Sequence, residues 1–421
     1  MDPALVPIDS GSTAWMLTSS ALVLLMVPGL AMFYAGMVRR KNIIATMMFS
    51  YGAMAVIGVQ WILIGYCLSF GKSIGGIIGW DPGLIGLNAL EHTRRYADKA
   101  IPELVFVMFQ GKFAIITPAL ISGAVAERMR FSSFLVFAVL WATFVYAPLA
   151  HWVWAPGGWL YERGVLDYAG GTVVHVSSGV SALVLAALIG RRLDYVPGSG
   201  GAVLPHNLPM TLTGAGLLWF GWFGFNAGSA VAVESPVAGA SAGLAFATTQ
   251  TAAAAAGLVW MLIEWWHHGK PTSLGMASGI VAGLVAITPA AGHVHPWSAL
   301  IIGAVASLLC FLAVQLKGRL GYDDSLDAFG VHGVGGFFGA VATGLFCFVP
   351  VAGGLLGGGM AQPLKQLMAA GVAAGYAAVM TLILALVVRA TIGLRATPEQ
   401  ERDGLDLTIH GERGYHSEFT S

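Results

Sequence analysis

Long apolar stretches recur along almost the whole chain and constrain its fold more than any other feature. Eleven runs approach the ~20 residues that a helix needs to cross a bilayer. They lie at about 15–38, 43–68, 104–125, 132–152, 171–189, 210–227, 238–263, 274–288, 296–316, 325–348 and 364–388. Backbone polar groups in lipid must be hydrogen-bonded within the segment or within a closed barrel. The runs therefore predict an all-α integral membrane protein of about eleven transmembrane helices.

The composition excludes several classes of protein. Charged residues make up 10% of the chain and hydrophobic residues 57%, whereas soluble domains carry roughly 25% charged residues. A net charge of zero argues against a nucleic-acid partner. Cys67, Cys310 and Cys347 lie in or beside apolar runs without metal-ligand spacing. With no nucleophilic triad and no phosphate-binding loop, the sequence predicts neither an enzyme nor a metal or cofactor site.

The distribution of Lys and Arg predicts the orientation in the membrane. With the N-terminus outside, fourteen of these residues fall in inner segments and six in outer ones, and Lys112 lies inside a span. Cytoplasmic loops carry the excess of positive charge. We therefore expect a multi-pass protein of the cell (inner or plasma) membrane, with the N-terminus outside and a cytoplasmic C-terminal tail at 390–421.

A faint internal repeat divides this single membrane domain, residues 1–421. Leu166-Asp167 enters the fifth span and Leu326-Asp327 enters the tenth. Five spans separate the two, so the halves run in opposite directions, and such folds place the substrate path between the repeats. We expect half-repeats at about 12–190 and 208–348. An eleventh helix at about 364–389 would follow them.

Two histidines lie within apolar spans, His175 in the fifth and His332 in the tenth. The other nine fall in loops, tails or span ends. An ionisable group at membrane depth is costly, so it usually faces a pathway, and a neutral imidazole offers that pathway one donor and one acceptor. The alternative is a purely structural role in helix packing. The sequence leaves open whether the two rings meet.

One helix stripe combines aromatic and polar residues near the outer side. Trp222, Phe225, Asn226 and Ser229 are spaced i, i+3, i+4 and i+7, so they share one face. An interfacial aromatic belt is the alternative interpretation, but Asn and Ser require polar partners. The stripe is predicted to face the pore.

Three further aromatic residues are candidates. Phe109 and Phe113 are four residues apart and stack along one face, where they would form a hydrophobic gate or ordinary core. Trp154 lies at an outer span end, where its ring would hold a cation or join the belt.

A family resemblance is carried by six segments, at 33–42, 124–131, 166–175, 221–229, 327–333 and 404–406. Through them the sequence resembles the Amt/Mep/Rh ammonium transporters, in their bacterial Amt branch, from about residue 15 to residue 412. The resemblance implies transport of ammonium or ammonia for nitrogen uptake. It also implies a homotrimer with one pore per subunit, and a PII-type regulatory protein that docks on the cytoplasmic face.

The resemblance also implies roles for individual residues. Trp154, Ser229 and Phe109 match an outer site that recruits ammonium, and Phe109 and Phe225 match a stacked gate below it. His175 and His332 match the twin histidines of the pore. Asp167 matches a buried carboxylate that orders the substrate site. Lys112 departs from the pattern, because a lysine facing the pore would repel ammonium.

The expected mechanism is that ammonium loses its proton before or within the bore, because a bare cation in an apolar bore is costly. Ammonia would then pass the two histidines. An ammonium sensor that passes little substrate is one alternative, although the short tail offers no output domain. A gas or water channel is another, but it leaves Trp154 and Ser229 without a cation to hold.

Overall fold

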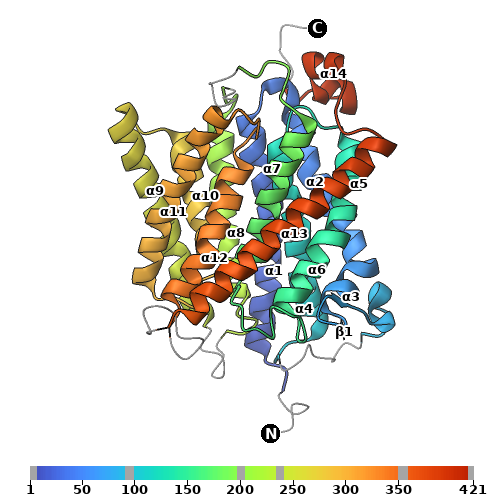
Figure 1. The fold of residues 1–421 in the computed structure, drawn as a ribbon, viewed down its shortest axis with the longest axis vertical. Coiled ribbons are helices and arrows are strands. Elements are labelled where there is room, and N and C mark those ends of the chain that lie inside the picture. The colour runs from blue at the N-terminus through green and yellow to red at the C-terminus, as the bar shows by residue number, and fades with distance from the viewer. Residues whose placement is uncertain (1–6, 91–98, 197–203, 234–240, 349–358, 416–421) are drawn as a thin grey trace.

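The computed structural model describes residues 7–90, 99–196, 204–233, 241–348 and 359–415 of the 421-residue chain. Its helices form one bundle with the two termini at opposite ends (Figure 1). We call the end that holds the N-terminus the N-face and the opposite end, where the C-terminal tail lies, the C-face.

Eleven helical segments of the described chain cross the bundle between these faces. They are α1 (Ser10–Met37), α2 (Ile43–Gln60) with η3 (Trp61–Gly65) and α3 (Tyr66–Phe70), α4 (Glu103–Val125), α5 (Phe131–Trp141) with η5 (Ala142–Tyr146) and α6 (Ala147–Trp154), η6 (Gly171–Val176) with α7 (Ser177–Ile189), α8 (Leu208–Gly228), α9 (Ala242–His268), α10 (Ser273–Ile287), α11 (Pro296–Leu320), η7 (Phe329–Gly333) with α12 (Val334–Phe346), and α13 (Ala361–Thr391). Shorter elements are η2 (Arg40–Asn42), the antiparallel pair β1 (Ser73–Ile74) and β2 (Ile78–Gly79), η4 (Pro82–Leu87), α14 (Pro398–Asp403) and η9 (Asp406–His410).

This order confirms the predicted all-α membrane protein, an inverted repeat of five plus five spans followed by a final helix, α13. Nine of the described helices are long and apolar enough to cross a membrane. The other two segments are α10, which is apolar but only 15 residues long, and α8, in which glycines and tryptophans are frequent. Large apolar side chains such as Leu308 and Leu312 are exposed on the outside of the bundle, as expected of a surface that meets lipid.

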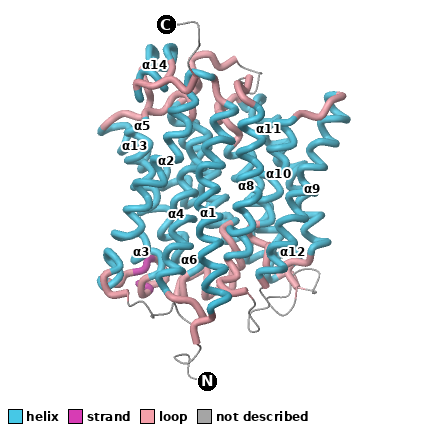
Figure 2. Tube along the Cα trace, turned by 180° about the vertical axis from the view of Figure 1, so that it is seen from behind, coloured by secondary structure: helices cyan, strands magenta, loops and turns pink. Residues whose placement is uncertain are grey.

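The centre of the bundle is held together by close contact between α1 and α8. A Cβ at Gly214 would lie 2.3 Å from Phe33 N, and a Cβ at Gly221 would lie 2.2 Å from Met26 Cγ. Only glycine permits this approach, as is usual between membrane helices. Seen from behind, α1 lies between α4 and α8 (Figure 2). These helices supply many of the residues that surround the pathway described below.

A buried ionic network ties the loops together at the C-face. Glu127 is 1% exposed, and its carboxylate accepts hydrogen bonds from Arg39 Nε (2.8 Å), Arg192 Nη1 (2.9 Å) and Asn42 Nδ2 (3.0 Å). Arg192 also donates to Asp323 Oδ1 (2.7 Å). Burial alone would raise the pKa of Glu127, but the hydrogen bonds and positive charges of Arg39 and Arg192 lower it to about 2. The carboxylate is therefore ionised at neutral pH.

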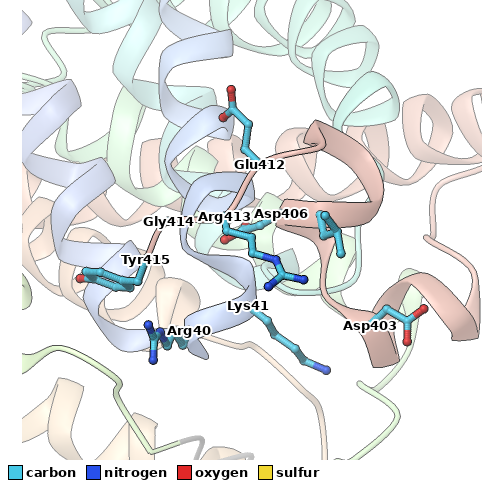
Figure 3. A pocket seen from close by; sticks show the side chains of 9 residues that line it. Arg40, Lys41, Asp403, Asp406, Glu412, Arg413, Gly414 and Tyr415 are labelled. Atoms are coloured by element: carbon cyan, nitrogen blue, oxygen red, sulfur yellow. The ribbon is translucent and has the colours of Figure 1, made fainter. Parts of the chain in front are cut away.

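The tail is docked onto this network. Leu405 N donates to Asn42 Oδ1 (2.9 Å), and Asp406 Oδ1 accepts from Ala45 N (2.8 Å) in the first turn of α2. Lys41 Nζ donates to the carbonyl of Glu401 (3.0 Å). Between the tail and η2 lies a pocket of about 360 Å³ whose lining mixes basic and acidic side chains (Figure 3). The tail therefore packs as part of the C-face.

Candidate functional site

Two helices begin inside the bundle, and a carboxylate caps the first of them. Asp167 Oδ1 accepts from the backbone N–H groups of Gly170 (3.0 Å) and Gly171 (2.6 Å). Its Oδ2 accepts from those of Thr172 and Val173 (both 3.0 Å). Gly170 has φ 108°, a conformation that glycine adopts without steric cost. Four otherwise unpaired donors at the start of η6 are satisfied in this way.

Asp324 caps the second such helix from the opposite direction. Its Oδ1 accepts from Ala328 N (3.1 Å) and its Oδ2 from Phe329 N (2.8 Å), at the start of η7. Asp327 instead has φ 60° and forms an ion pair with Lys317 Nζ (2.5 Å). Asp324 is therefore the counterpart of Asp167.

The predicted equivalence of Asp167 with Asp327 was wrong, because Asp324, three residues earlier, caps η7. In the corrected register Gly170 corresponds to Asp327, and both have positive φ. Each histidine then follows its capping aspartate by eight residues.

Glycines let the two broken helices cross closely. Gly179 and Gly336 each follow a histidine by four residues. A Cβ at Gly179 would lie 2.1 Å from Gly333 N, and a Cβ at Gly336 would lie 2.8 Å from His175 Cβ. Each glycine thus makes room for the other helix at the level of the histidines.

The two predicted histidines meet at the crossing. Nδ1 of His332 lies 3.3 Å from Nδ1 of His175, and the ring centroids are 5.3 Å apart with planes at 15°. The exposed fractions are 1% for His175 and 4% for His332. A hydrogen bond between two Nδ1 atoms requires one donor and one acceptor, so two neutral rings adopt opposite tautomers. Nε2 of His175 has no hydrogen-bond partner in the described part of the chain and is free to meet a passing molecule.

Two cavities extend from this pair. The first is lined by Met26, Leu30, Phe33, Ile116, Leu120, Val174, His175, Leu218, Trp222, Phe225, Val281 and His332. The second is lined by Phe33, Tyr34, Met37, Leu274, Ser278, Val281, Leu326, Asp327, Ala328, Val331 and His332. Phe33, Val281 and His332 border both cavities. Together they mark a largely apolar path from Phe225 past the histidines toward Asp327 near the C-face.

The indole of Trp222 forms a wall of this path. Its ring stacks on His175, with centroids 5.4 Å apart and planes at 21°. Its Nε1 donates to Thr288 Oγ1 (2.8 Å), and this hydroxyl donates to Leu284 O (2.8 Å). The polar edge of Trp222 is thereby anchored, while its apolar face supports the histidine.

A stack of phenylalanines closes the N-face end of the first cavity. Phe225 stacks on Phe113, with centroids 4.1 Å apart and planes at 27°. Phe109 packs edge to face against Phe113, and the centroids of these two rings are 4.9 Å apart. The prediction that Phe109 stacks on Phe225 was therefore wrong, because Phe113 takes that position. The positions i and i+4 share a helix face, and the sequence does not reveal which of the two reaches Phe225.

The predicted outer residues gather around this stack. Trp154 meets Phe113 edge to face at 5.9 Å and donates from Nε1 to Asp167 O (2.8 Å). Ser229 caps the end of α8 and donates from Oγ to Phe225 O (2.8 Å). Trp154 and Ser229 are both half-buried. Asp167 contacts Trp154 through its carbonyl, while its carboxylate is taken up by the cap of η6.

Lys112 lies away from the path. It is half-buried, as are Leu104 and Met108, which precede it at intervals of four residues on α4. Phe109 and Phe113 are buried, and Lys112 lines neither cavity. The lysine therefore occupies the partly exposed stripe of α4.

Sequence reasoning missed Asp324, Thr288 and the glycine pair. The spacing of eight residues between Asp324 and His332, equal to that between Asp167 and His175, was a signal that could have identified Asp324. For Thr288 the sequence offers no comparable signal, because its contact with Trp222 joins residues 66 positions apart.

Comparisons with known proteins agree with this arrangement. Residues 14–415 match the Ammonium Transporter Family. The chain is 48% identical over 420 residues to an ammonium transporter of Bacillus subtilis (strain 168), covering 96% of this chain and 98% of that one. It is 47% identical over 410 residues to the ammonium transporter Amt1 of Archaeoglobus fulgidus, covering 97% of this chain and 100% of its relative.

Solved structures give the same result. The crystal structure of Saccharomyces cerevisiae Mep2 superposes with a TM-score of 0.85 at 38% identity, covering 94% of this chain and 90% of Mep2. A structure described as a sensor Amt protein superposes with a TM-score of 0.87 at 31% identity, covering 94% and 97% of the two chains. The two sequence relatives are named ammonium transporters rather than enzymes, and this chain belongs to the ammonium transporter family.

Proposed function

We propose that this protein carries ammonium nitrogen across the cell membrane through the path described above. The contact between His175 and His332 in a buried, largely apolar path is the observation that carries the proposal. Polar groups at membrane depth are costly and usually serve a substrate or proton path. The names of the relatives supply the substrate, ammonium.

Recruitment takes place at Trp154 and Ser229 in this proposal. The face of an indole attracts a cation with about 0.5–2 kcal/mol, and the hydroxyl of Ser229 offers an acceptor. The Nε1–H of Trp154 is fixed on Asp167 O, which sets the orientation of the ring. We assign the carboxylate of Asp167 to ordering this site through η6, because its four hydrogen bonds leave it little capacity for substrate.

Selection against water and hydrated ions falls to the stacked rings of Phe113 and Phe225, with Phe109 on the outer side. An apolar constriction opposes the passage of charge because it cannot replace the hydration shell. Ammonium therefore gives up its proton at or before this level. Ammonia continues past Trp222 to the histidine pair.

The histidines guide ammonia and, in this proposal, offer a route for its proton. Ammonia is both a donor and an acceptor of hydrogen bonds, and opposite tautomers present it with one group of each kind. Whether the proton crosses with the ammonia is decided by measuring charge movement.

The orientation and the assembly complete the proposal. The excess of Lys and Arg in segments at the C-face supports placing the N-face outside the cell. We further propose a homotrimer with one path per subunit, and a PII-type protein that docks on the C-face and closes the path.

An ammonium sensor is the second candidate function. The neighbour described as a sensor Amt protein supports it, because that protein shares the fold over 94% of this chain. A sensor would bind ammonium at Trp154 and Ser229 and pass little of it.

Current recording on liposomes that contain the purified protein separates the two functions. A transporter gives an ammonium-evoked current or a change in internal pH. Trp154→Ala should then raise the half-saturating ammonium concentration by about 2- to 30-fold, the equivalent of the lost cation–π energy. Trp266→Ala is the control, because Trp266 lies near the C-face end of α9 and is 91% exposed. Ammonium binding without current or pH change would favour the sensor.

A further inference from the structure

The eleventh helix holds the entry of the first broken helix through one side chain. Gln366 lies on α13 and is 0% exposed. Its Oε1 accepts from Leu166 N (2.8 Å), and its Nε2 donates to Leu166 O (2.6 Å). One amide side chain thus satisfies both backbone groups of a single residue, in the manner of a neighbouring β-strand. Buried backbone groups left unpaired cost about 1–3 kcal/mol each.

Leu166 is the residue directly before Asp167. The carbonyl of Asp167 accepts the indole hydrogen of Trp154, and its carboxylate caps the helix that carries His175. The position of the Leu166 peptide therefore determines where both groups of Asp167 lie. Gln366 lies on α13, outside the repeat, yet it holds the backbone of Leu166, which precedes Asp167 and the helix that carries His175.

The same side chain also reaches the second broken helix. Nε2 of Gln366 donates to Ala340 O (3.2 Å) on α12, eight residues beyond His332. Gln362, one turn earlier on α13, donates to Gln366 Oε1 (3.2 Å) and to Gly164 O (3.0 Å). Figure 1 shows α13 crossing the bundle obliquely, past α12. This course brings one helix against both halves of the repeat.

We propose that Gln366 is a positioning residue for the site, holding Trp154 and the two broken helices in register from the eleventh helix. The inference rests on the proposed function, because it assigns Trp154 to ammonium recruitment. Gln366 touches no substrate. It acts through Leu166 on Asp167 and Trp154.

The test compares two variants of the same helix in proteoliposomes. Gln366→Met keeps the length of the side chain and removes its hydrogen bonds. Thr381→Val is the matched control, because Thr381 is also 0% exposed and its hydroxyl lies between Ser181 Oγ (2.7 Å) and Trp141 Nε1 (3.1 Å). It lies 15 residues further along α13, about 22 Å away. Both variants lose buried hydrogen bonds, but only the bonds of Gln366 are made to Leu166.

We expect Gln366→Met to raise the half-saturating ammonium concentration by about tenfold, while Thr381→Val leaves it within twofold of the wild-type value. Thermal unfolding in detergent measures the stability lost by each. If both variants lose stability and neither changes half-saturation, Gln366 is merely structural and the proposal is overturned.

The proposal stays testable if Gln366→Met does not fold. Gln366→Asn, whose amide is one methylene too short for Leu166, then takes its place with the same two outcomes. A wild-type protein that gives neither current nor pH change would refute transport itself. Ammonium binding to that protein, measured for the wild type and the Gln366 variant, would still decide whether Gln366 positions Trp154.

Discussion

Replacing Glu127 by Gln removes the central charge of the C-face network without changing the size of the side chain. The pKa of Glu127 is lowered from 4.5 to about 2. At 1.36 kcal/mol per pKa unit, this difference corresponds to about 3 kcal/mol of folding stability at neutral pH. Glu127→Gln should therefore unfold several degrees below the wild type at pH 7, since about 1 kcal/mol shifts the melting temperature of a large domain by roughly 2 °C.

The pH dependence of this difference has a definite sign. Because the pKa is lower in the folded state, the stabilisation is complete above the unfolded value of 4.5 and is lost as the pH falls toward about 2. Thermal unfolding in detergent, recorded for both proteins between pH 7 and pH 3, should show the gap closing at the acidic end. Effects of titrating groups outside this network cancel in the difference.

An exposed glutamate provides the control for Glu127. Glu399 pairs with Arg402 at 3.2 Å, with side chains 68% and 64% exposed, and such pairs contribute little to stability. Glu399→Gln should therefore unfold like the wild type. A Glu127→Gln protein that unfolds at the wild-type temperature at pH 7, or a gap that does not change with pH, would refute the assigned network.

Three further predictions concern the path itself. Gly336→Ala places a Cβ 2.8 Å from His175 Cβ, so we expect about 1–3 kcal/mol of destabilisation and reduced ammonium flux. Gly371→Ala, with open space around it, should leave flux unchanged. Equal effects of the two substitutions would contradict the close helix crossing at Gly336. Phe113→Ala should let ions leak through proteoliposomes more than Phe109→Ala does, because Phe113 makes the stack with Phe225; the reverse order of leak would restore the original pairing. Asp324→Ala should lower the stability by about 0.5–2 kcal/mol, the usual cost of a lost helix cap, and unchanged thermal unfolding would argue against its equivalence to Asp167.

The sequence predicted the parts of this protein that depend on hydrophobic periodicity and on the cost of polar groups in lipid. Each apolar run became a helical segment, including the short run 274–288, which is α10 (Ser273–Ile287). The two histidines within spans were recognised because few other ionisable groups lie at that depth. Their contact depends on two glycines at a helix crossing, and the sequence alone did not show that those glycines face each other.

The errors have a common physical origin. Asp324 and Asp327 are both close enough to cap η7, and only the backbone conformation, with φ 60° at Asp327, decides between them. Phe109 and Phe113 share one helix face, and the rotation of α4 in the bundle selects the ring that meets Phe225. Gln366 lies 200 residues from Leu166, a distance at which local patterns carry no information.

Ammonium-driven flux through proteoliposomes shows whether ammonia passes along His175 and His332. The measurement compares the wild type with a protein carrying both His175→Leu and His332→Leu, and uses His295→Leu, an exposed histidine near the N-face, as the control. We expect the double variant to fold and to lose most of its flux, while the control retains it. A folded double variant with wild-type flux would refute passage along the histidines and leave them with a packing role only.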